Sequence, residues 1–321
     1  MRIKLPLAVV CACLMTSLSP TIAYEQTGAK KRQGQREIAV TFDDLPAPRG
    51  SLETMRYITT NLLKSIKANN VPAIGFVNEG KLYVGGKVDA RRVAFLEMWL
   101  DAGLELGNHT FSHVYIDETP LAAYKEDVIR GEIVTRRLLA ERGMKLKYFR
   151  HTQLRTGPTP EYKRELDEFL AERGYEIAPV TIDNHENIFA TVYAKAKRRG
   201  DRETLKLVAD AYLRYMEEIL AFFEGLSAES LGYEVKQTLL LHTNELNADY
   251  FDELARMMKD RGYRFISLEE ALKDPAYKLP DAQVKKGLSW LHRWMLAKGQ
   301  KMKPEPSAPE FITRLFKNYP R

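Results

Sequence analysis

Short apolar runs alternate with longer helical patterns along most of the chain, and this alternation limits the fold more than any other feature. Seven runs predict strands, at residues 37–42, 73–77, 105–107, 147–150, 176–182, 237–241 and 264–266. Helical patterns lie between them, at residues 52–69, 89–102, 120–142, 160–173, 201–224 and 248–261. Strands that alternate with helices form a parallel sheet, which is either open and doubly wound or closed into a barrel.

Polar residues that follow the predicted strands separate these two alternatives. They stand at the strand ends in chain order: Asp43, Asp44, Asn78, His109, Arg150, Asp183 and His242. A barrel presents side chains at the carboxyl ends of successive strands, whereas an open sheet gathers them only near its switch point. We therefore predict an α/β fold with a (β/α) barrel of about seven parallel strands.

The first 23 residues have the pattern of a secretory signal peptide. A basic start precedes an apolar stretch and small residues at Thr21 and Ala23, which predicts cleavage near Ala23 and export to the periplasm or the medium. Modification of Cys13 as a lipoprotein is the alternative. The apolar stretch is shorter than the roughly 20 residues of a membrane span, so we do not expect a membrane-spanning protein. Residues 24–36 are polar and predict a flexible leader.

Cysteine usage and net charge limit the metal ligands and the partners that we expect. The two cysteines, Cys11 and Cys13, both lie in the signal segment, so a metal site in the mature chain would be built from His, Asp and Glu. The formal net charge of +6 is spread along the chain rather than gathered in blocks. We therefore expect no nucleic-acid partner.

The last part of the chain, residues 273–321, breaks the alternation. It carries six prolines and a basic helical pattern at residues 284–296 with Trp290 and Trp294 on one face. We predict a C-terminal helical extension that packs on the barrel. Stacking of the tryptophans on a sugar is the alternative.

Two pairs of residues indicate a hydrolytic metal site. Asp43 and Asp44 follow the first strand, and successive side chains at a strand end point different ways, so one carboxylate can bind a metal while its neighbour acts as a base. His109 and His113 are four residues apart, which predicts that both lie on one side of a helical turn. Zn²⁺ binds carboxylate and imidazole and keeps an open position for water in catalytic sites, and other divalent transition metals accept the same ligands.

Five strings carry a resemblance to a known family: VTFDDLP, NHTFSH, YFRHTQLRTG, TIDNHENIF and LLLHTNELNA. In this order they closely resemble the motifs of the polysaccharide deacetylases, the NodB-homology group known as carbohydrate esterase family four. The resemblance covers roughly residues 37–272. The first two motifs match specifically, the fifth supports them, and the third and fourth match in part.

The resemblance implies a zinc-dependent N- or O-deacetylase on a distorted (β/α) barrel at residues 37–272. It implies that Asp44, His109 and His113 bind the metal. It also implies that Asp43 is the general base that deprotonates the metal-bound water. An opposite charge beside such a carboxylate would keep it ionised.

Three further roles follow from the resemblance. His242 would be the general acid for the leaving group, Arg150 would orient Asp43, and Asp183 would hold His242 by a hydrogen bond. Acyl transfer needs an activated nucleophile, stabilisation of the tetrahedral oxyanion and a proton for the leaving group, and these residues with a metal suffice for all three.

The third and fourth motifs depart from the family pattern. His151-Thr152-Gln153 stand where the family has prolines and an aromatic residue, and His185-Glu186-Asn187 replace a second aspartate and a tryptophan, so Glu186 could act as the second acid. We predict a hydrolase that removes acetyl groups from an amino-sugar polysaccharide or oligosaccharide, with a cell-wall or extracellular glycan as its partner. The alternatives are hydrolysis of a non-sugar amide or ester, and a carbohydrate-binding homologue with weak catalysis.

Overall fold

The computed structural model of the chain describes residues 35–47 and 50–319. The predicted signal peptide lies outside the described residues, as does the leader up to Gly34. The last residue assigned to the leader, Arg36, already belongs to the first strand.

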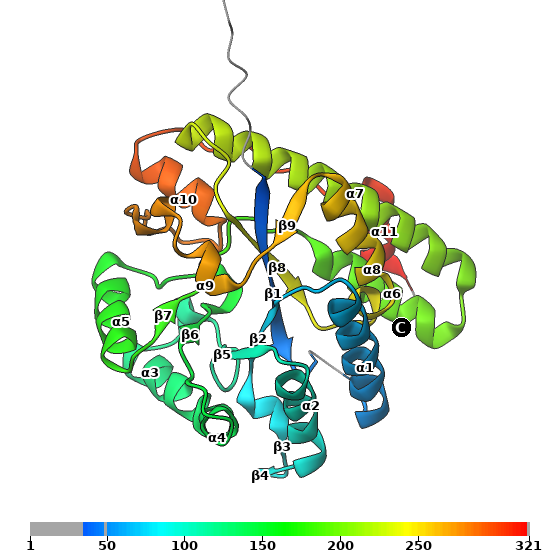
Figure 1. Ribbon diagram of the computed structural model, residues 1–321, viewed down its shortest axis with the longest axis horizontal. Coiled ribbons are helices and arrows are strands. Elements are labelled where there is room, and N and C mark those ends of the chain that lie inside the picture. The colour runs from blue at the N-terminus through cyan, green and yellow to red at the C-terminus, as the bar shows by residue number, and fades with distance from the viewer. Residues whose placement is uncertain (1–34, 48–49, 320–321) are drawn as a thin grey trace, which may run out of the picture. The chain divides into compact units, whose positions relative to one another are not determined.

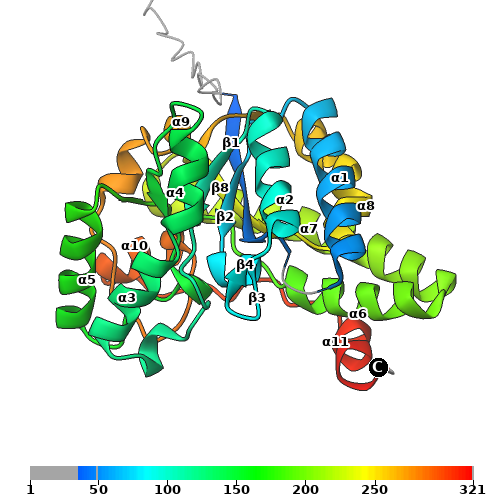
Figure 2. The same ribbon diagram turned by 90° about the horizontal axis from the view of Figure 1, so that it is seen from below.

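A mostly parallel sheet curls into a half-barrel with helices around it (Figures 1 and 2), which confirms the predicted fold class. Its strands run in the order β7-β6-β5-β2-β1-β8, and β9 pairs with the first residues of β1. The seven strands are β1 (Arg36–Leu45), β2 (Ile74–Val77), β5 (Glu105–Asn108), β6 (Tyr148–Phe149), β7 (Glu176–Ile177), β8 (Gln237–His242) and β9 (Tyr263–Phe265). A small antiparallel pair, β3 (Tyr83–Val84) and β4 (Lys87–Val88), lies outside this sheet.

The strand predicted at 176–182 is shorter than expected because the chain changes partner within it. Pairing with β6 stops after Ala178, whose N–H donates to Phe149, and the next residue, Pro179, has no N–H to continue the ladder. Ile182 then forms an isolated parallel bridge with Leu239 of β8. The segment thus joins the two edges of the half-barrel.

Helices alternate with the strands along the chain and lie around the sheet, and most of them begin near the residues that the patterns predicted. Ser51 and Asp89 cap the first two helices through their side-chain oxygens, as expected for such residues at an N-terminus. The helices are α1 (Leu52–Ala68), α2 (Ala90–Asp101), α3 (Leu121–Arg130), α4 (Ile133–Ala140), α5 (Pro160–Glu172), α6 (Glu186–Arg199), α7 (Arg202–Leu231), α8 (Glu245–Asp260), α9 (Leu268–Ala271), α10 (Trp290–Ala297) and α11 (Glu310–Asn318). Short 3₁₀ turns occupy Glu79–Leu82, Ile116–Glu118, Thr152–Leu154 and Pro275–Lys278. The helices α6, α9 and α11 were not predicted.

The helix predicted at 120–142 is interrupted at Gly131. A Cβ on Gly131 would lie 2.5 Å from the carbonyl carbon of Thr110, so the helix is broken where the loop after β5 packs against it. Glu79 then caps the second half, accepting bonds from the N–H groups of Val134 and Thr135 at 3.0 and 2.6 Å. The break therefore makes room for the loop that carries the predicted histidine ligands.

The C-terminal extension packs against the barrel. Its helix α10 begins at Trp290 rather than at Val284, after a cap by Ser289. Trp290 and Trp294 are both buried, and Trp294 packs edge-on against Tyr277. Their burial supports the packing interpretation over sugar stacking. Within residues 35–47 and 50–319, no helix has the length and hydropathy needed to cross a bilayer.

Candidate metal centre and active site

The carboxyl end of β1 places the two aspartates. The register with β2 shifts between Phe42 and Leu45, and Asp44 has a positive φ of 73°. Such a bulge re-aims side chains, and aspartate tolerates the left-handed region better than most residues. Asp43 and Asp44 therefore take different surroundings: Asp43 is buried, whereas Asp44 is half-buried.

The two histidines come from a loop, not from the helical turn that their spacing predicted. The loop follows β5, and Thr110 and His113 both have positive φ angles, of 68° and 55°. The rings of His109 and His113 lie edge to face, with centroids 5.0 Å apart. The loop is fixed by Asp127 of α3, which accepts from the Phe111 N–H at 3.0 Å and from the Ser112 N–H at 2.9 Å. Packing of the loop against α3, rather than helical spacing, thus brings the two rings together.

Asp44, His109 and His113 converge as a group that could hold a metal ion, because one ligand atom from each lies within 4.8 Å of the others. The Nδ1 of His109 lies 2.8 Å from the carbonyl oxygen of Arg150, so this nitrogen carries the proton and the Nε2 lone pair faces the group. Burial lowers the pKa of His109 to about 3 and that of His113 to about 4. Both imidazoles are therefore neutral at pH 7, as metal ligation requires, and the donor set fits Zn²⁺ or another divalent transition metal.

A lysine outside the five motifs contacts the predicted ligand Asp44. The Lys81 Nζ donates to Asp44 Oδ1 at 2.9 Å and to Asn78 Oδ1 at 2.8 Å. Burial would raise the pKa of Asp44, but Lys81 and the nearby histidines outweigh it and hold this pKa well below its usual range. Lys81 lies in the turn after β2 and belongs to no motif, so only the fold could have identified it.

Arg150 lies beside Asp43, as the resemblance implied. Its Nη1 donates to Asp43 Oδ1 at 3.1 Å, its Nε to the Ala178 carbonyl at 2.7 Å and its Nη2 to Thr41 Oγ1 at 3.0 Å. Burial raises the pKa of Asp43, and the Arg150 charge opposes that rise. Asp43 also approaches the ligand group, with its Oδ2 3.6 Å from His109 Nε2.

His242 ends β8 directly beside Asp43, because the two residues are partners in the β1–β8 register. Glu186, not Asp183, contacts this histidine: its Oε2 lies 3.4 Å from His242 Nδ1 and accepts the His242 backbone N–H at 3.1 Å. Asp183 bonds instead to the Asn184 N–H, and no hydrogen bond of the described residues joins it to His242. The expected Asp183 contact is therefore corrected to Glu186.

The physical reason is the unpredicted helix α6. It begins at Glu186 and carries that side chain, which is fully buried, back toward the end of β8. The other oxygen of Glu186 accepts from Asn247 Nδ2 at 2.6 Å and from Asn244 Nδ2. Burial would lower the pKa of His242, but the hydrogen bond and charge of Glu186 outweigh it, with Asp44 and Asp43 adding to the effect, and raise this pKa to about 9. His242 is thus protonated at pH 7.

A comparison with known families adds to this geometry. A sequence profile described as polysaccharide deacetylase matches residues 30–177, a segment that contains the aspartates, both ligand histidines and Arg150. Residues 30–177 therefore match the polysaccharide deacetylase family. No curated protein sequence matches the chain significantly.

Several solved structures are similar to this chain. The peptidoglycan deacetylase PdaC from Bacillus subtilis shares 19% identity over 75% of this chain and 93% of its own, with a TM-score of 0.45. A family 4 carbohydrate esterase from Streptomyces lividans in complex with acetate shares 17% identity over 74% and 95%, with a TM-score of 0.43. The protein BA3943 from Bacillus anthracis, described as a pseudoenzyme, shares 15% identity over 75% and 66%, with a TM-score of 0.46.

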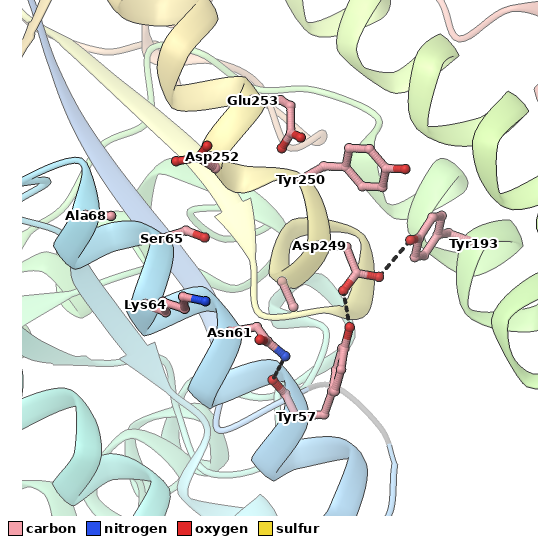
Figure 3. A pocket seen from close by; sticks show the side chains of 11 residues that line it. Tyr57, Asn61, Lys64, Ser65, Ala68, Tyr193, Asp249, Tyr250, Asp252 and Glu253 are labelled. Carbon is pink, nitrogen blue, oxygen red and sulfur yellow. Dashed lines mark hydrogen bonds between the residues drawn. The ribbon is translucent and has the colours of Figure 1, made fainter.

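A surface groove of about 690 Å³ lies between α1 and α8, and none of the predicted site residues lines it. Figure 3 shows Asp249 at its centre, where the carboxylate accepts a hydrogen bond from Tyr193 at 2.7 Å and another from Tyr57. Lys197 forms an ion pair with the same carboxylate at 2.5 Å. These bonds join α1, α6 and α8, so Asp249 contributes to packing of the helices around β8.

Proposed function

We propose that this chain is an active, metal-dependent hydrolase of the polysaccharide deacetylase family that removes acetyl groups from an N- or O-acetylated amino-sugar polysaccharide or oligosaccharide. The observation that carries the proposal is the convergence of Asp44, His109 and His113 within 4.8 Å, with Asp43 and His242 paired beside them. A metal site, a candidate base and a candidate acid thus lie together at one edge of the sheet.

The fit of the ligand group supports a bound cation. His109 keeps its Nε2 lone pair available because Nδ1 is bonded to the Arg150 carbonyl, and both imidazoles are neutral at pH 7. When bound to Asp44, His109 and His113, a divalent metal would polarise the acyl carbonyl and lower the pKa of a water molecule toward ~7.

The residues around this position supply the proton transfers. Asp43 accepts the proton of the attacking water on its carboxylate, which Arg150 holds in place and whose ionised form the Arg150 charge favours against the effect of burial. His242 donates a proton from Nε2 to the departing nitrogen or oxygen, because Glu186 occupies its Nδ1 side and keeps the ring protonated. The two groups need opposite protonation states: the charge of Arg150 favours the ionised carboxylate of Asp43, and the charge of Glu186 favours the protonated ring of His242.

The substrate and the location of the enzyme belong to the same proposal. Acylated sugars are favoured by the family, and PdaC, one of the similar proteins, is described as a peptidoglycan deacetylase. We propose a cell-wall or extracellular glycan as the substrate. Export after cleavage near Ala23 would bring the enzyme to such a glycan.

The test is acetate release by the full chain purified without chelator, together with its metal content. Oligomers of N-acetylated amino sugar, an O-acetylated polysaccharide and small acylated amides serve as substrates. Asp43→Asn should lower the rate by roughly 10²–10⁴-fold, the range for loss of a general base. His113→Ala should lose the metal and the activity together. Asp101→Asn, the same exchange at an exposed carboxylate paired with Arg142, is the matched control and should keep both.

Each negative result has a definite meaning. Wild-type protein without bound metal, and inactive when zinc or cobalt is added, would refute the mechanism. Tight glycan binding without acetate release would show a binding protein, and release from small amides alone would remove the sugar from the proposal.

A further inference from the structure

The third motif, which departs from the family pattern, places Gln153 against a predicted metal ligand. The amide Nε2 of Gln153 lies 2.9 Å from Nδ1 of His113. The other end of the amide, Oε1, is buried and has no hydrogen-bond partner. A buried polar atom without a partner is costly, so this amide has an unused acceptor beside the metal group.

The orientation of this amide decides which ring nitrogen of His113 carries the proton. With Nε2 toward His113, the ring accepts at Nδ1 and holds its proton on Nε2, where a metal would have to bind. A half-turn of the amide places Oε1 against Nδ1 instead, so that Nδ1 donates and the Nε2 lone pair is free. The same arrangement already exists at His109, whose Nδ1 is bonded to the Arg150 carbonyl at 2.8 Å.

Gln153 is held in an unfavourable backbone conformation. Gln153 and Leu154 have positive φ angles of 49° and 53°. Non-glycine residues adopt this region only where the surroundings enforce it, and such strain is concentrated at functional sites.

The C-terminal extension holds Gln153 and Leu154 in this backbone conformation. A Cβ on Gly287 would lie 2.0 Å from the Gln153 carbonyl oxygen, so only glycine lets the extension approach so closely. Arg293, which is fully buried, donates from Nη2 to the Leu154 carbonyl at 2.7 Å and from Nη1 to Thr156 Oγ1 at 3.2 Å. The extension therefore contacts the turn that carries Gln153 at two places, Gly287 and Arg293.

We propose that Gln153 is a positioning residue for the metal ligand His113, and that the C-terminal extension holds it in place through Gly287 and Arg293. Gln153 fixes the ring orientation and tautomer of His113, so the extension contributes to metal affinity without touching the metal. This inference rests on the proposed function, because it assumes that His113 binds the cation.

The experiment measures zinc affinity, by competition with a chromogenic chelator, and the absorption spectrum of the cobalt-substituted protein. Gln153→Leu should weaken zinc binding about 10–100-fold and shift the cobalt bands, the usual effect of losing a partner of a metal-ligating histidine. Gln153→Glu should bind zinc close to the wild-type affinity, because a carboxylate accepts the Nδ1 proton. Gln283→Leu, which removes another glutamine bond at the same interface (to the Gly157 carbonyl, 2.7 Å), is the matched control and should not change affinity.

A second pair of variants tests the extension itself. Gly287→Ala should weaken zinc binding like Gln153→Leu, whereas Gly225→Ala should not, since a Cβ on Gly225 meets no atom within 4 Å. Thermal unfolding of each variant shows that it is folded. If the wild type binds zinc and Gln153→Leu binds it with the same affinity, the positioning role alone is overturned. Wild-type protein that binds no zinc would refute the metal site and this inference with it.

Discussion

Arg150→Met is the most direct test of the electrostatic design around Asp43. Arg150 is fully buried and Asp43 is 3% exposed, so the pair is held away from water. The guanidinium donates three sets of hydrogen bonds and lies 4.5 Å from the centre of the Phe76 ring. Methionine keeps much of the side-chain volume but removes the charge and every donor.

Breaking a buried ion pair by removing one partner costs about 3–5 kcal/mol, because the other charge is left buried without compensation. We expect this loss in the free energy of unfolding of the metal-free variant at pH 8. Burial already raises the pKa of Asp43, and loss of Arg150 raises it further. As the pH falls, Asp43 is therefore protonated in the folded variant, and the cost of burying its unpaired charge disappears. The loss in the free energy of unfolding should then be smaller at pH 5 than at pH 8.

The assay is urea unfolding with chelator present, at pH 5 and pH 8, on wild type, Arg150→Met and the double variant Asp43→Asn/Arg150→Met. The double variant lacks the uncompensated charge, so it should be more stable than Arg150→Met at pH 8. A loss below about 1 kcal/mol for Arg150→Met, the size of an exposed ion pair, would refute the reasoning. Equal stability of the single and double variants would also refute it.

Two further predictions concern the acid and the ligand loop. Glu186→Gln removes the negative charge that raises the pKa of His242 to about 9, so kcat/KM should start to fall at a lower pH than in wild type; an unchanged basic limb in the pH–rate profile would argue against the pairing. Gly131→Ala places a Cβ 2.5 Å from Thr110 and should lower the free energy of unfolding by about 1–3 kcal/mol in urea titrations. Gly225→Ala has open space and should not be destabilised, so equal losses in both variants would contradict the tight packing at Gly131.

The fold class was predictable because hydrophobic periodicity is a local property. The seven predicted strand runs and the observed parallel strands of the half-barrel correspond one to one. Residues at the ends of parallel strands must meet at one edge of a sheet, which explains why Asp43, His109 and Arg150 could be grouped before any contact was known. His242 joined them because β8 pairs with β1.

The partners of those residues were not predictable in the same way. The spacing of His109 and His113 suggested a helical turn, but a loop with positive φ angles, packed at the break at Gly131, brings the rings together. Lys81 reaches Asp44 from a turn with no motif. In each case the contact depends on packing between segments distant in sequence.

The sequence by itself determined the order of the strands and of most helices, and the residue types of the candidate metal site, since these are written in short local patterns. Only the tertiary structure decided that Glu186 rather than Asp183 contacts His242, because the choice depends on where α6 begins. It also decided that the C-terminal extension holds the Gln153 turn beside His113. Charges and ligands can be identified along a chain, but the neighbours that set their protonation come together only when distant segments pack.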